Sequence, residues 1–247
     1  MLEFLKTKKT KIAYHLFEGR KEMTIVFLGG FMSDMQGIKA LALEAFAKEQ
    51  AVSFIRFDYF GHGESSGEFK DGTIGHWKED VLNVIDQLTC GNLILVGSSM
   101  GGWLMLLAAR ERQERIKGLV GIAAAPDFTQ NRIWEILDEK HRALIKTQGW
   151  LPIPCDDPDA GEPYPVTFRL IEEGKDHLLL QNKIDIHCPV RLLQGGMDTD
   201  VPRDTPLKLL DLIQSDDMTF ELVKNSNHRF SSESDIKLIK RKILELM

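Results

Sequence analysis

The chain has 247 residues, of which 43% are hydrophobic and 28% charged, and its net charge of −6 argues against a nucleic-acid-binding surface. It has no run of about 18 apolar residues that could span a membrane and no apolar N-terminal segment for secretion, so we expect neither stable membrane insertion nor export. The three cysteines, Cys90, Cys155 and Cys188, lack metal-ligand spacing and fit a reducing compartment: the cytoplasm or, if a transit peptide has been removed, an organelle matrix.

Apolar runs typical of buried strands alternate with amphipathic segments typical of helices along most of the chain. Strands are predicted at 2–8, 11–17, 23–28, 52–58, 92–96, 119–125, 190–193 and 218–223. Helices are predicted at 39–49, 77–88, 103–110, 205–213 and from about 235 to 246. Alternation of this kind, with apolar strands, is typical of a parallel sheet covered by helices on both faces. We therefore expect an α/β fold with a mostly parallel sheet of eight strands.

The alternation stops between residues 127 and 187. A helix is predicted at 131–147 and a shorter one at 166–173, whereas 151–165 holds five of the nine prolines and is predicted to lack regular structure. We interpret 127–187 as a small cap inserted into a core formed by 1–126 and 188–247. A long surface connection is the alternative, but apolar residues at helical spacing favour packing.

Residues 97–101 fit the pattern G-x-S-x-G, with Ser99 at its centre. They stand between a predicted buried strand and a predicted helix, which is the context that a nucleophile elbow needs. Such a turn strains the serine backbone and exposes its hydroxyl, and glycines two residues before and after it leave room for the neighbouring backbone. A plain Gly/Ser turn is the alternative. Ser98 is a weaker candidate nucleophile because it lacks glycines at those positions.

A serine nucleophile needs a base and an acid that orients the base. With this type of elbow the chain order is Ser, then Asp or Glu, then His. His228 follows the last predicted strand and Asp198 follows the strand before it, so we predict Ser99, Asp198 and His228 as a catalytic triad. Asp200 is a rival for the acid. Asp198 is preferred because it lies closer to the strand end.

The backbone N–H groups of Phe31 and Met100 are predicted to form an oxyanion hole, the first in the loop after strand 23–28 and the second directly after Ser99. The chemistry requires no cofactor and no metal, and the glycines at 97–102 lack the Lys-Ser/Thr ending of a phosphate-binding loop. His62, Asp58 and Trp103 are interpreted as structural. The candidates for lining an acyl pocket, with cap packing as an equal interpretation, are Trp134, Trp150, Leu151, Ile153 and Phe168.

The sequence resembles the α/β-hydrolase superfamily over nearly its whole length outside the cap. Within it, the chain is similar to the branch of the mitochondrial palmitoyl-protein thioesterase and acyl-glucuronide esterase and their bacterial relatives. The segments that carry this resemblance are 55–65 (IRFDYFGHGES), 95–105 (LVGSSMGGWLM), 188–193 (CPVRLL) and 227–229 (NHR). The resemblance implies an α/β-hydrolase fold and Ser99, Asp198 and His228 as the triad. Two departures stand out: Gly29 occupies the place of a common histidine, and Asn227 that of an aspartate.

We therefore expect a serine esterase or thioesterase acting on acylated proteins or small acyl compounds. An amidase or peptidase with the same triad, and a non-catalytic binding protein on the same fold, are the alternatives. The sequence leaves open the acyl chain length, the leaving group, and whether the protein is a monomer or a homodimer.

Overall fold

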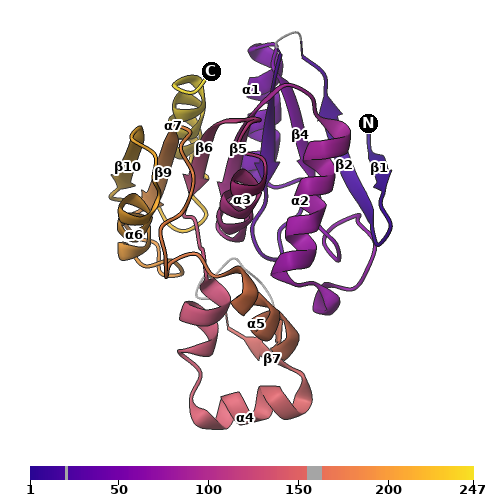
Figure 1. Cartoon of the computed structure of the whole chain (residues 1–247), viewed down its shortest axis with the longest axis vertical. Helices are drawn as coiled ribbons and strands as arrows, with labels where there is room; N and C mark the ends of the chain where they lie inside the picture. Colours follow the sequence, from indigo (N-terminus) through magenta and orange to yellow (C-terminus); the bar gives the residue numbers. More distant parts are fainter. Residues whose placement is uncertain (20–21, 155–162) are drawn as a thin grey trace.

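The computed structural model describes residues 1–19, 22–154 and 163–247, and its centre is one eight-stranded sheet (Figure 1). The strand order is β1-β2-β4-β3-β5-β6-β9-β10, in which β1 and β2 are antiparallel to their neighbours and the remaining pairs are parallel. The strands are β1 (Glu3–Lys6), β2 (Lys11–Phe17), β3 (Met23–Leu28), β4 (Ser53–Phe57), β5 (Asn92–Ser98), β6 (Ile116–Ile122), β9 (Val190–Gly195) and β10 (Met218–Val223). The predicted mostly parallel sheet of eight strands is confirmed.

Helices cover both faces of this sheet. They are α1 (Ile38–Glu49), α2 (Ile74–Leu88), α3 (Met100–Glu111), α6 (Asp204–Leu212) and α7 (Glu233–Leu244). Successive side chains of a strand point to opposite faces, so β3 supplies both layers of the core. Val26 and Leu28 pack with residues of α2 and α3, whereas Ile25 and Phe27 pack with residues of α1 and α7. This explains why residues 25–28 of β3 are a continuous apolar run.

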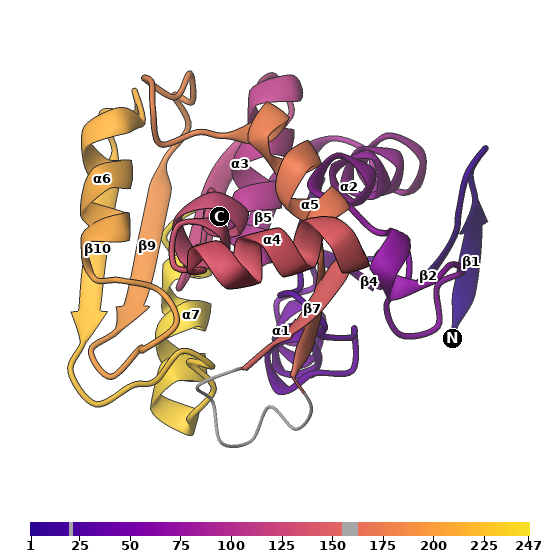
Figure 2. The ribbon, with the colours of Figure 1, turned by 90° about the horizontal axis from the view of Figure 1, so that it is seen from below.

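The chain between β6 and β9 forms a separate small layer at one end of the sheet (Figure 1). Seen from below, α4, α5 and β7 lie in front of β5 and α3 (Figure 2). The layer contains η2 (Thr129–Trp134), α4 (Glu139–Gln148), β7 (Trp150–Ile153), β8 (Tyr164–Thr167), α5 (Phe168–Gly174) and η3 (Lys175–His177). This layer, within the predicted insertion 127–187, is called the cap below.

Two predictions for the cap were wrong. The single helix expected at 131–147 is two pieces, because the Asp138 side chain accepts the His141 N–H and so starts α4 as a new helix. The proline-rich stretch 151–165 contains strand structure: β7 and β8 pair antiparallel, with Pro152 opposite Pro165. A sheet of only two strands leaves one side of each strand without a partner, so a residue lacking an N–H is tolerated there. Residues 155–162, including Cys155, lie outside the described part of the chain.

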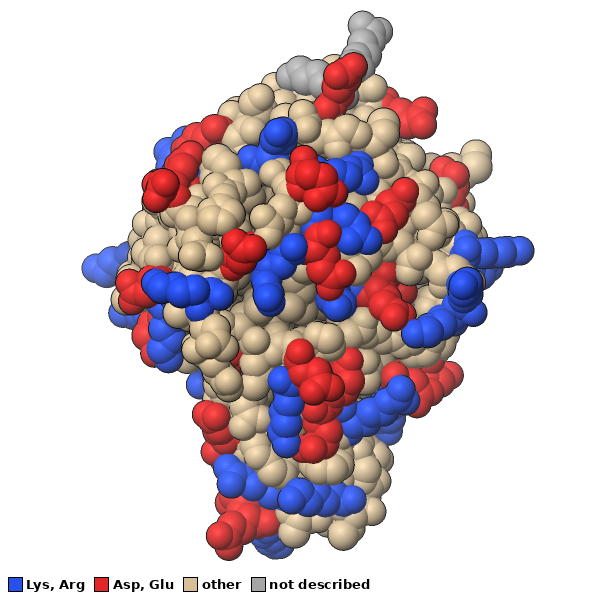
Figure 3. Space-filling view, viewed as in Figure 1, with Lys and Arg blue, Asp and Glu red and all other residues tan. Residues whose placement is uncertain are grey.

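Lys and Arg are interspersed with Asp and Glu over the face shown in Figure 3. The ion pair Lys78–Glu111 links α2 to α3, and Asp86–Arg112 links α2 to the residue directly after α3. Among the described residues, the helices lack the combination of length and hydropathy needed to cross a bilayer.

Candidate active site

Ser99 stands alone between the last residue of β5 and the first residue of α3. Its backbone has φ +53° and ψ −120°, a conformation that residues with a side chain rarely adopt. The turn is so tight that a Cβ on Gly97 would lie 2.4 Å from the Gly101 carbonyl oxygen. A Cβ on Gly101 would lie 2.1 Å from the Leu28 carbonyl oxygen. The two glycines of the motif are therefore required by contact between backbone segments.

The side chains of Ser99, His228 and Asp198 form a continuous hydrogen-bonded row. His228 Nε2 lies 3.0 Å from Ser99 Oγ, and His228 Nδ1 lies 2.9 Å from Asp198 Oδ2. Each comes from a different loop at the same end of the sheet, after β5, β9 and β10. Because an aspartate oxygen accepts from Nδ1–H, Nε2 is left as the acceptor for the serine proton. The structure thus brings the three predicted residues together.

The Asp198 carboxylate is fully buried and surrounded by donors. Its Oδ1 accepts the N–H groups of Asp200 and Val201, each at 2.9 Å, and its Oδ2 also accepts Gln194 Nε2 at 2.6 Å. These bonds satisfy a buried charge and fix the direction of the carboxylate. Neither Gln194 nor this network was identified from the sequence, because amide-to-carboxylate bonds within a loop leave no pattern in residue spacing.

Asp200, the rival acid, occupies a different place. Its carboxylate lies 3.8 Å from His228 Nε2, whereas Asp198 contacts Nδ1. Asp198, Asp200 and His228 each offer one ligand atom within 4.8 Å of the others, which makes them the candidate metal-binding group of the described residues. However, both Asp198 oxygens and both His228 nitrogens already have protein partners. The donor set therefore fits an acid–base row better than a cation site.

The loop after β3 approaches Ser99 from the other side. A Cβ on Gly30 would lie 3.5 Å from the Ser99 Cβ. The loop turns through Gly30–Ser33, closed by the Ser33 N–H and hydroxyl, which both donate to the Gly30 carbonyl. In the described part of the chain, neither the Phe31 N–H nor the Met100 N–H donates to a protein acceptor. Both predicted oxyanion donors thus lack a protein acceptor there, and their residues line the same cavity as Ser99.

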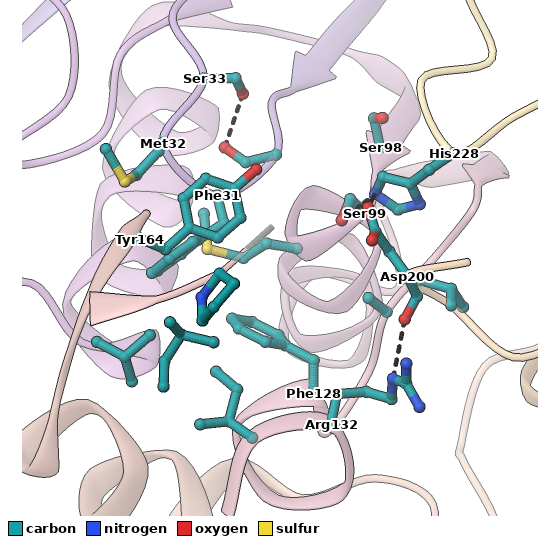
Figure 4. Close-up of a pocket in the computed structure, with 18 of the residues that line it drawn as sticks. Phe31, Met32, Ser33, Ser98, Ser99, Phe128, Arg132, Tyr164, Asp200 and His228 are labelled. Atoms are coloured by element: carbon teal, nitrogen blue, oxygen red, sulfur yellow. Dashed lines mark hydrogen bonds and ion pairs between the residues drawn. The ribbon is translucent and has the colours of Figure 1, made fainter. Parts of the chain in front are cut away.

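A cavity of about 1320 Å³ lies between the core and the cap, with Ser99 and His228 in its wall (Figure 4). The cap contributes a group of apolar lining residues: Phe128, Ile133, Leu137, Leu144, Leu151, Ile153 and Val166. The wall also includes charged residues, namely Asp34, Lys39, Arg132, Asp138, Asp200 and Arg229. An apolar chamber with a few polar groups beside a nucleophile is a typical small-molecule site.

The five candidate acyl-pocket residues divide between the two interpretations. Leu151 and Ile153 line the cavity, but Trp134, Trp150 and Phe168 are absent from its described wall. The Trp134 and Phe168 rings pack against each other, with centroids 6.0 Å apart, and Lys70 Nζ lies 3.3 Å from the centroid of the Trp150 ring. Apolar residues at helical spacing predict that a cap helix packs against something. The spacing does not show which of these residues line the cavity and which pack elsewhere in the cap.

The Phe31 ring is held among four other aromatic rings. Edge-on contacts join it to Phe69 at 4.9 Å and Trp77 at 5.8 Å in the core, and to Phe128 and Tyr164 at 5.5 Å on the cap side. Such contacts are favourable beyond the area that they bury. The loop that carries a predicted oxyanion donor is therefore anchored by core and cap together.

His62 and Asp58, interpreted as structural, are buried beside this loop. His62 Nδ1 lies 3.1 Å from the Phe60 carbonyl oxygen, and Nε2 accepts the Met32 N–H at 3.3 Å. Burial lowers the pKa of His62 to about 4. Asp58 accepts the N–H groups of Met35 and Glu64, and burial raises its pKa. Both side chains organise loops at the mouth of the cavity.

Two contacts between cap and core were not foreseen. Arg132 of η2 donates from Nε to the Asp200 carbonyl at 2.9 Å and from Nη2 to the Thr199 carbonyl at 3.3 Å (Figure 4). Trp103, predicted to pack beneath the elbow, is fully buried and also donates from Nε1 to the His177 carbonyl at 3.0 Å.

The described cysteines do not resemble nucleophiles. Cys90 is exposed and is not among the described residues that line the cavity. Burial raises the pKa of Cys188 to about 11, which keeps its thiol protonated near neutral pH.

Comparison with known proteins gives a consistent result. A model of the alpha/beta hydrolase fold family matches residues 24–146. Over 228 residues the chain is 40% identical to the "Palmitoyl-protein thioesterase ABHD10, mitochondrial" of Homo sapiens, covering 92% of this chain and 74% of that protein. The same match in Bos taurus is also 40% identical over 228 residues.

Solved structures are similar over the full length. Alpha/beta hydrolase domain-containing protein 10 from mouse superposes with a TM-score of 0.92 at 38% identity, covering 100% of this chain and 98% of that one. A protein from Agrobacterium vitis S4 superposes with a TM-score of 0.93 at 36% identity, covering 100% and 97%. Est1E from Butyrivibrio proteoclasticus, with bound ferulic acid, has a TM-score of 0.79 at 19% identity, covering 99% and 98%, which is a likeness in fold alone.

Proposed function

Since the chain belongs to the α/β hydrolase fold family, we propose that it is a serine hydrolase that cleaves carboxylic thioesters and esters through an acyl-enzyme. The observation that carries the proposal is the row Ser99–His228–Asp198 in the wall of an apolar cavity. The curated relatives are named palmitoyl-protein thioesterase, which supports a thioester with a long acyl chain as substrate. Their names also include the word mitochondrial, which is compatible with an organelle matrix.

In this mechanism the Ser99 hydroxyl attacks the acyl carbonyl carbon while His228 Nε2 takes its proton. Asp198 holds the imidazole in the required tautomer and stabilises its charged form. Negative charge then develops on the carbonyl oxygen, and the N–H groups of Phe31 and Met100 stabilise it. Donors that are already oriented need no reorganisation at that moment.

Collapse of this intermediate releases the thiol or alcohol, which receives the proton from His228. Water, deprotonated by the same histidine, then attacks the acyl-enzyme and frees Ser99. In this proposal the acyl chain lies against the apolar side of the cavity, among residues such as Leu137, Leu144 and Val166. Burying each methylene contributes about 0.8 kcal/mol, so binding should strengthen with chain length until the chamber is full.

The proposal is tested by hydrolysis of matched thioester and oxygen-ester series, from acetyl to palmitoyl. For Ser99→Ala we expect kcat to fall roughly 10⁴-fold or more, because no other group supplies the nucleophile. A fluorophosphonate should label the wild type and Ser98→Ala but not Ser99→Ala. Full hydrolytic activity in Ser99→Ala would contradict the mechanism. A labelled protein that hydrolyses only amides would indicate a peptidase, and an unlabelled, inactive wild type would indicate a binding protein.

A further inference from the structure

We propose that His62 is a positioning residue for the oxyanion hole: it holds the Gly30–Ser33 turn in the conformation that presents the Phe31 N–H to Ser99. This inference rests on the proposed function and adds to it a residue that lies outside the triad and the oxyanion donors.

The turn is in a conformation that its sequence does not favour. The Ser33 N–H donates to the Gly30 carbonyl at 3.2 Å, and Met32, the third residue, has φ +55°. A positive φ at the third position alone is the mark of a type II turn, which normally has glycine there. For a residue with a side chain the left-handed conformation costs about 1–2 kcal/mol. Left to itself, the turn would relax by rotating the Phe31–Met32 peptide.

His62 opposes that rotation. The Phe60 carbonyl can only accept, so Nδ1 carries the ring proton, and the Met32 N–H can only donate, so Nε2 is its acceptor. Rotation of the Phe31–Met32 peptide would replace the Met32 N–H by the Phe31 carbonyl oxygen, which faces the Nε2 lone pair unfavourably. It would also change ψ of Phe31, directly after the peptide that carries the Phe31 N–H, and so alter the loop that holds this donor. The buried neutral imidazole therefore selects one orientation of this peptide.

The ring of His62 is itself fixed by the aromatic groups that hold Phe31. Edge-on contacts join His62 to Phe69 at 5.0 Å and to Trp77 at 5.3 Å, and the same two rings contact Phe31. Trp77 Nε1 also donates to the Phe60 carbonyl that accepts from His62. His62 Nε2, which accepts the Met32 N–H, and the ring of Phe31 thus belong to one rigid group of packed rings. Such rigidity is needed to keep the Phe31 N–H in a fixed position.

The test separates the acceptor from the packing of the ring. A Gln side chain at position 62 can place its oxygen near the site of Nε2, whereas an Asn side chain is too short to do so. For His62→Asn we expect kcat on a thioester to fall about 10–100-fold with KM within about threefold. This loss is smaller than the 10²–10³ typical of removing an oxyanion donor. Affinity for an acyl trifluoromethyl ketone, whose adduct carries an oxyanion, should fall in parallel. His62→Gln should retain most of kcat.

If His62 acts by holding Met32 at positive φ, removing the strain at Met32 should restore kcat in the His62→Asn variant. A His62 side chain needed only for packing would not allow such a recovery. Glycine adopts φ +55° without steric cost. Adding Met32→Gly to His62→Asn should therefore recover about tenfold in kcat. His76→Asn is the matched control: His76 stacks on Phe60 at 4.1 Å and contacts Thr10 but does not touch the loop, so kcat should be unchanged. Wild-type kcat in His62→Asn, or equal losses in the single and double variants, would overturn the inference.

A second pair of variants leaves His62 in place, should its replacement prevent folding. Met32 is 43% exposed, so substitutions there leave the core intact. A β-branched residue is especially unfavourable at positive φ. We expect Met32→Val to lower both kcat and trifluoromethyl ketone affinity more than Met32→Leu does; equal losses in the pair would count against the proposal. If the wild type lacks Ser99-dependent hydrolysis, the proposed function fails; if it hydrolyses normally and only the His62 and Met32 results fail, this inference alone falls.

Discussion

Strained backbone is concentrated in single residues at the cavity end of the sheet. Of the six described non-glycine residues with positive φ, five follow strands that end there: Met32 follows β3, Ser99 follows β5, Ala123 and Asp127 follow β6, and Phe230 follows β10. The sixth, Ala51, precedes β4. Residues in such conformations persist only where the surroundings hold them in place, and they are common at functional sites. At Ser99 the surroundings are the backbone of β3 and α3, brought close by the glycines beside it.

Replacing Gly101 by alanine should therefore damage both stability and activity. The added Cβ would meet the carbonyl oxygens of Leu28 at 2.1 Å and Gly29 at 2.5 Å, and backbone atoms of a central strand cannot move aside. We expect a loss of about 3 kcal/mol or more in the free energy of unfolding, measured by urea titration. Gly37→Ala is the control, because its Cβ would meet only ordinary contact at 3.6 Å. Similar stability of the two variants would contradict this explanation.

At the scale of elements, the cap is joined to the core by directed polar bonds as well as by apolar packing. The Asp127 carboxylate accepts the N–H groups of Leu179 and Leu180, tying together the two ends of the inserted segment. Glu173 of α5 accepts the Gly75 N–H at the start of α2. A carboxylate is favourable there because the first N–H groups of a helix lack partners within it. The cap is consequently held in one position above Ser99.

Arg132 connects the cap to the loop that carries Asp198, so its replacement should affect catalysis. In Arg132→Gln the Thr199 and Asp200 carbonyls lose a charged donor, a bond of about 1.5–3 kcal/mol. We expect kcat/KM to fall about tenfold because the acid loop gains freedom.

Arg142 provides a matched comparison, since it also donates to two backbone carbonyls, those of Trp134 and Glu135, but entirely within the cap. Arg142→Gln should alter kcat/KM by less than about twofold. The measurement is kcat/KM of both variants on one thioester. Equal losses in the two variants would mean that Arg132 acts only on cap stability.

The elements that could be predicted from sequence are those whose residues follow a regular period. Strand Met23–Leu28 was predicted to the residue, because it contains four consecutive buried apolar residues, 25–28, and ends directly before a pair of glycines. Helix α2 begins at Ile74, three residues before the predicted start at 77, since the Thr73 hydroxyl caps it by accepting the His76 N–H. Apolar periodicity does not register such a cap.

For the site, chain order and strand ends were sufficient to select Ser99, Asp198 and His228; in the structure, His228 lies within hydrogen-bonding distance of both Ser99 and Asp198. The contacts of His62 and Arg132 could not be predicted, because each joins loops far apart in sequence through a backbone group. Every residue has a backbone carbonyl and every residue except proline has a backbone N–H, so the residue type does not indicate which backbone group is the partner.

At the scale of the whole molecule, the buried carboxyl of Asp80 makes stability depend on pH. Asp80 lies on α2 and is 1% exposed. Its Oδ2 accepts the Phe60 N–H at 2.7 Å, and Glu79 is a nearby negative charge. Burial raises the pKa of Asp80 from 3.8 to about 7. The folded protein therefore binds this proton more tightly than the unfolded chain, and the resulting stability is full below pH 3.8 and lost as pH rises through 7.

Asp80→Asn should remove this dependence, because an amide keeps an acceptor for the Phe60 N–H and does not ionise. Between pH 5 and pH 8, the free energy of unfolding of the wild type should fall by about 2–3 kcal/mol relative to that of the variant. Urea titrations of both proteins across this range measure the difference. A constant difference between pH 5 and 8 would show that Asp80 does not titrate there.

The position of the cap in the chain has a consequence for how this protein could diverge. Strands β6 and β9 are neighbours in the sheet, with Leu119 opposite Val190, and the whole cap is the excursion between them. The entropic cost of closing an inserted segment grows only with the logarithm of its length. Each doubling of the segment length therefore costs only about 0.6 kcal/mol. Insertions, deletions and new helices in the cap are therefore tolerated by the folded core. Descendants of one ancestral chain can acquire different acyl specificities while their nucleophile, base and acid stay where they are.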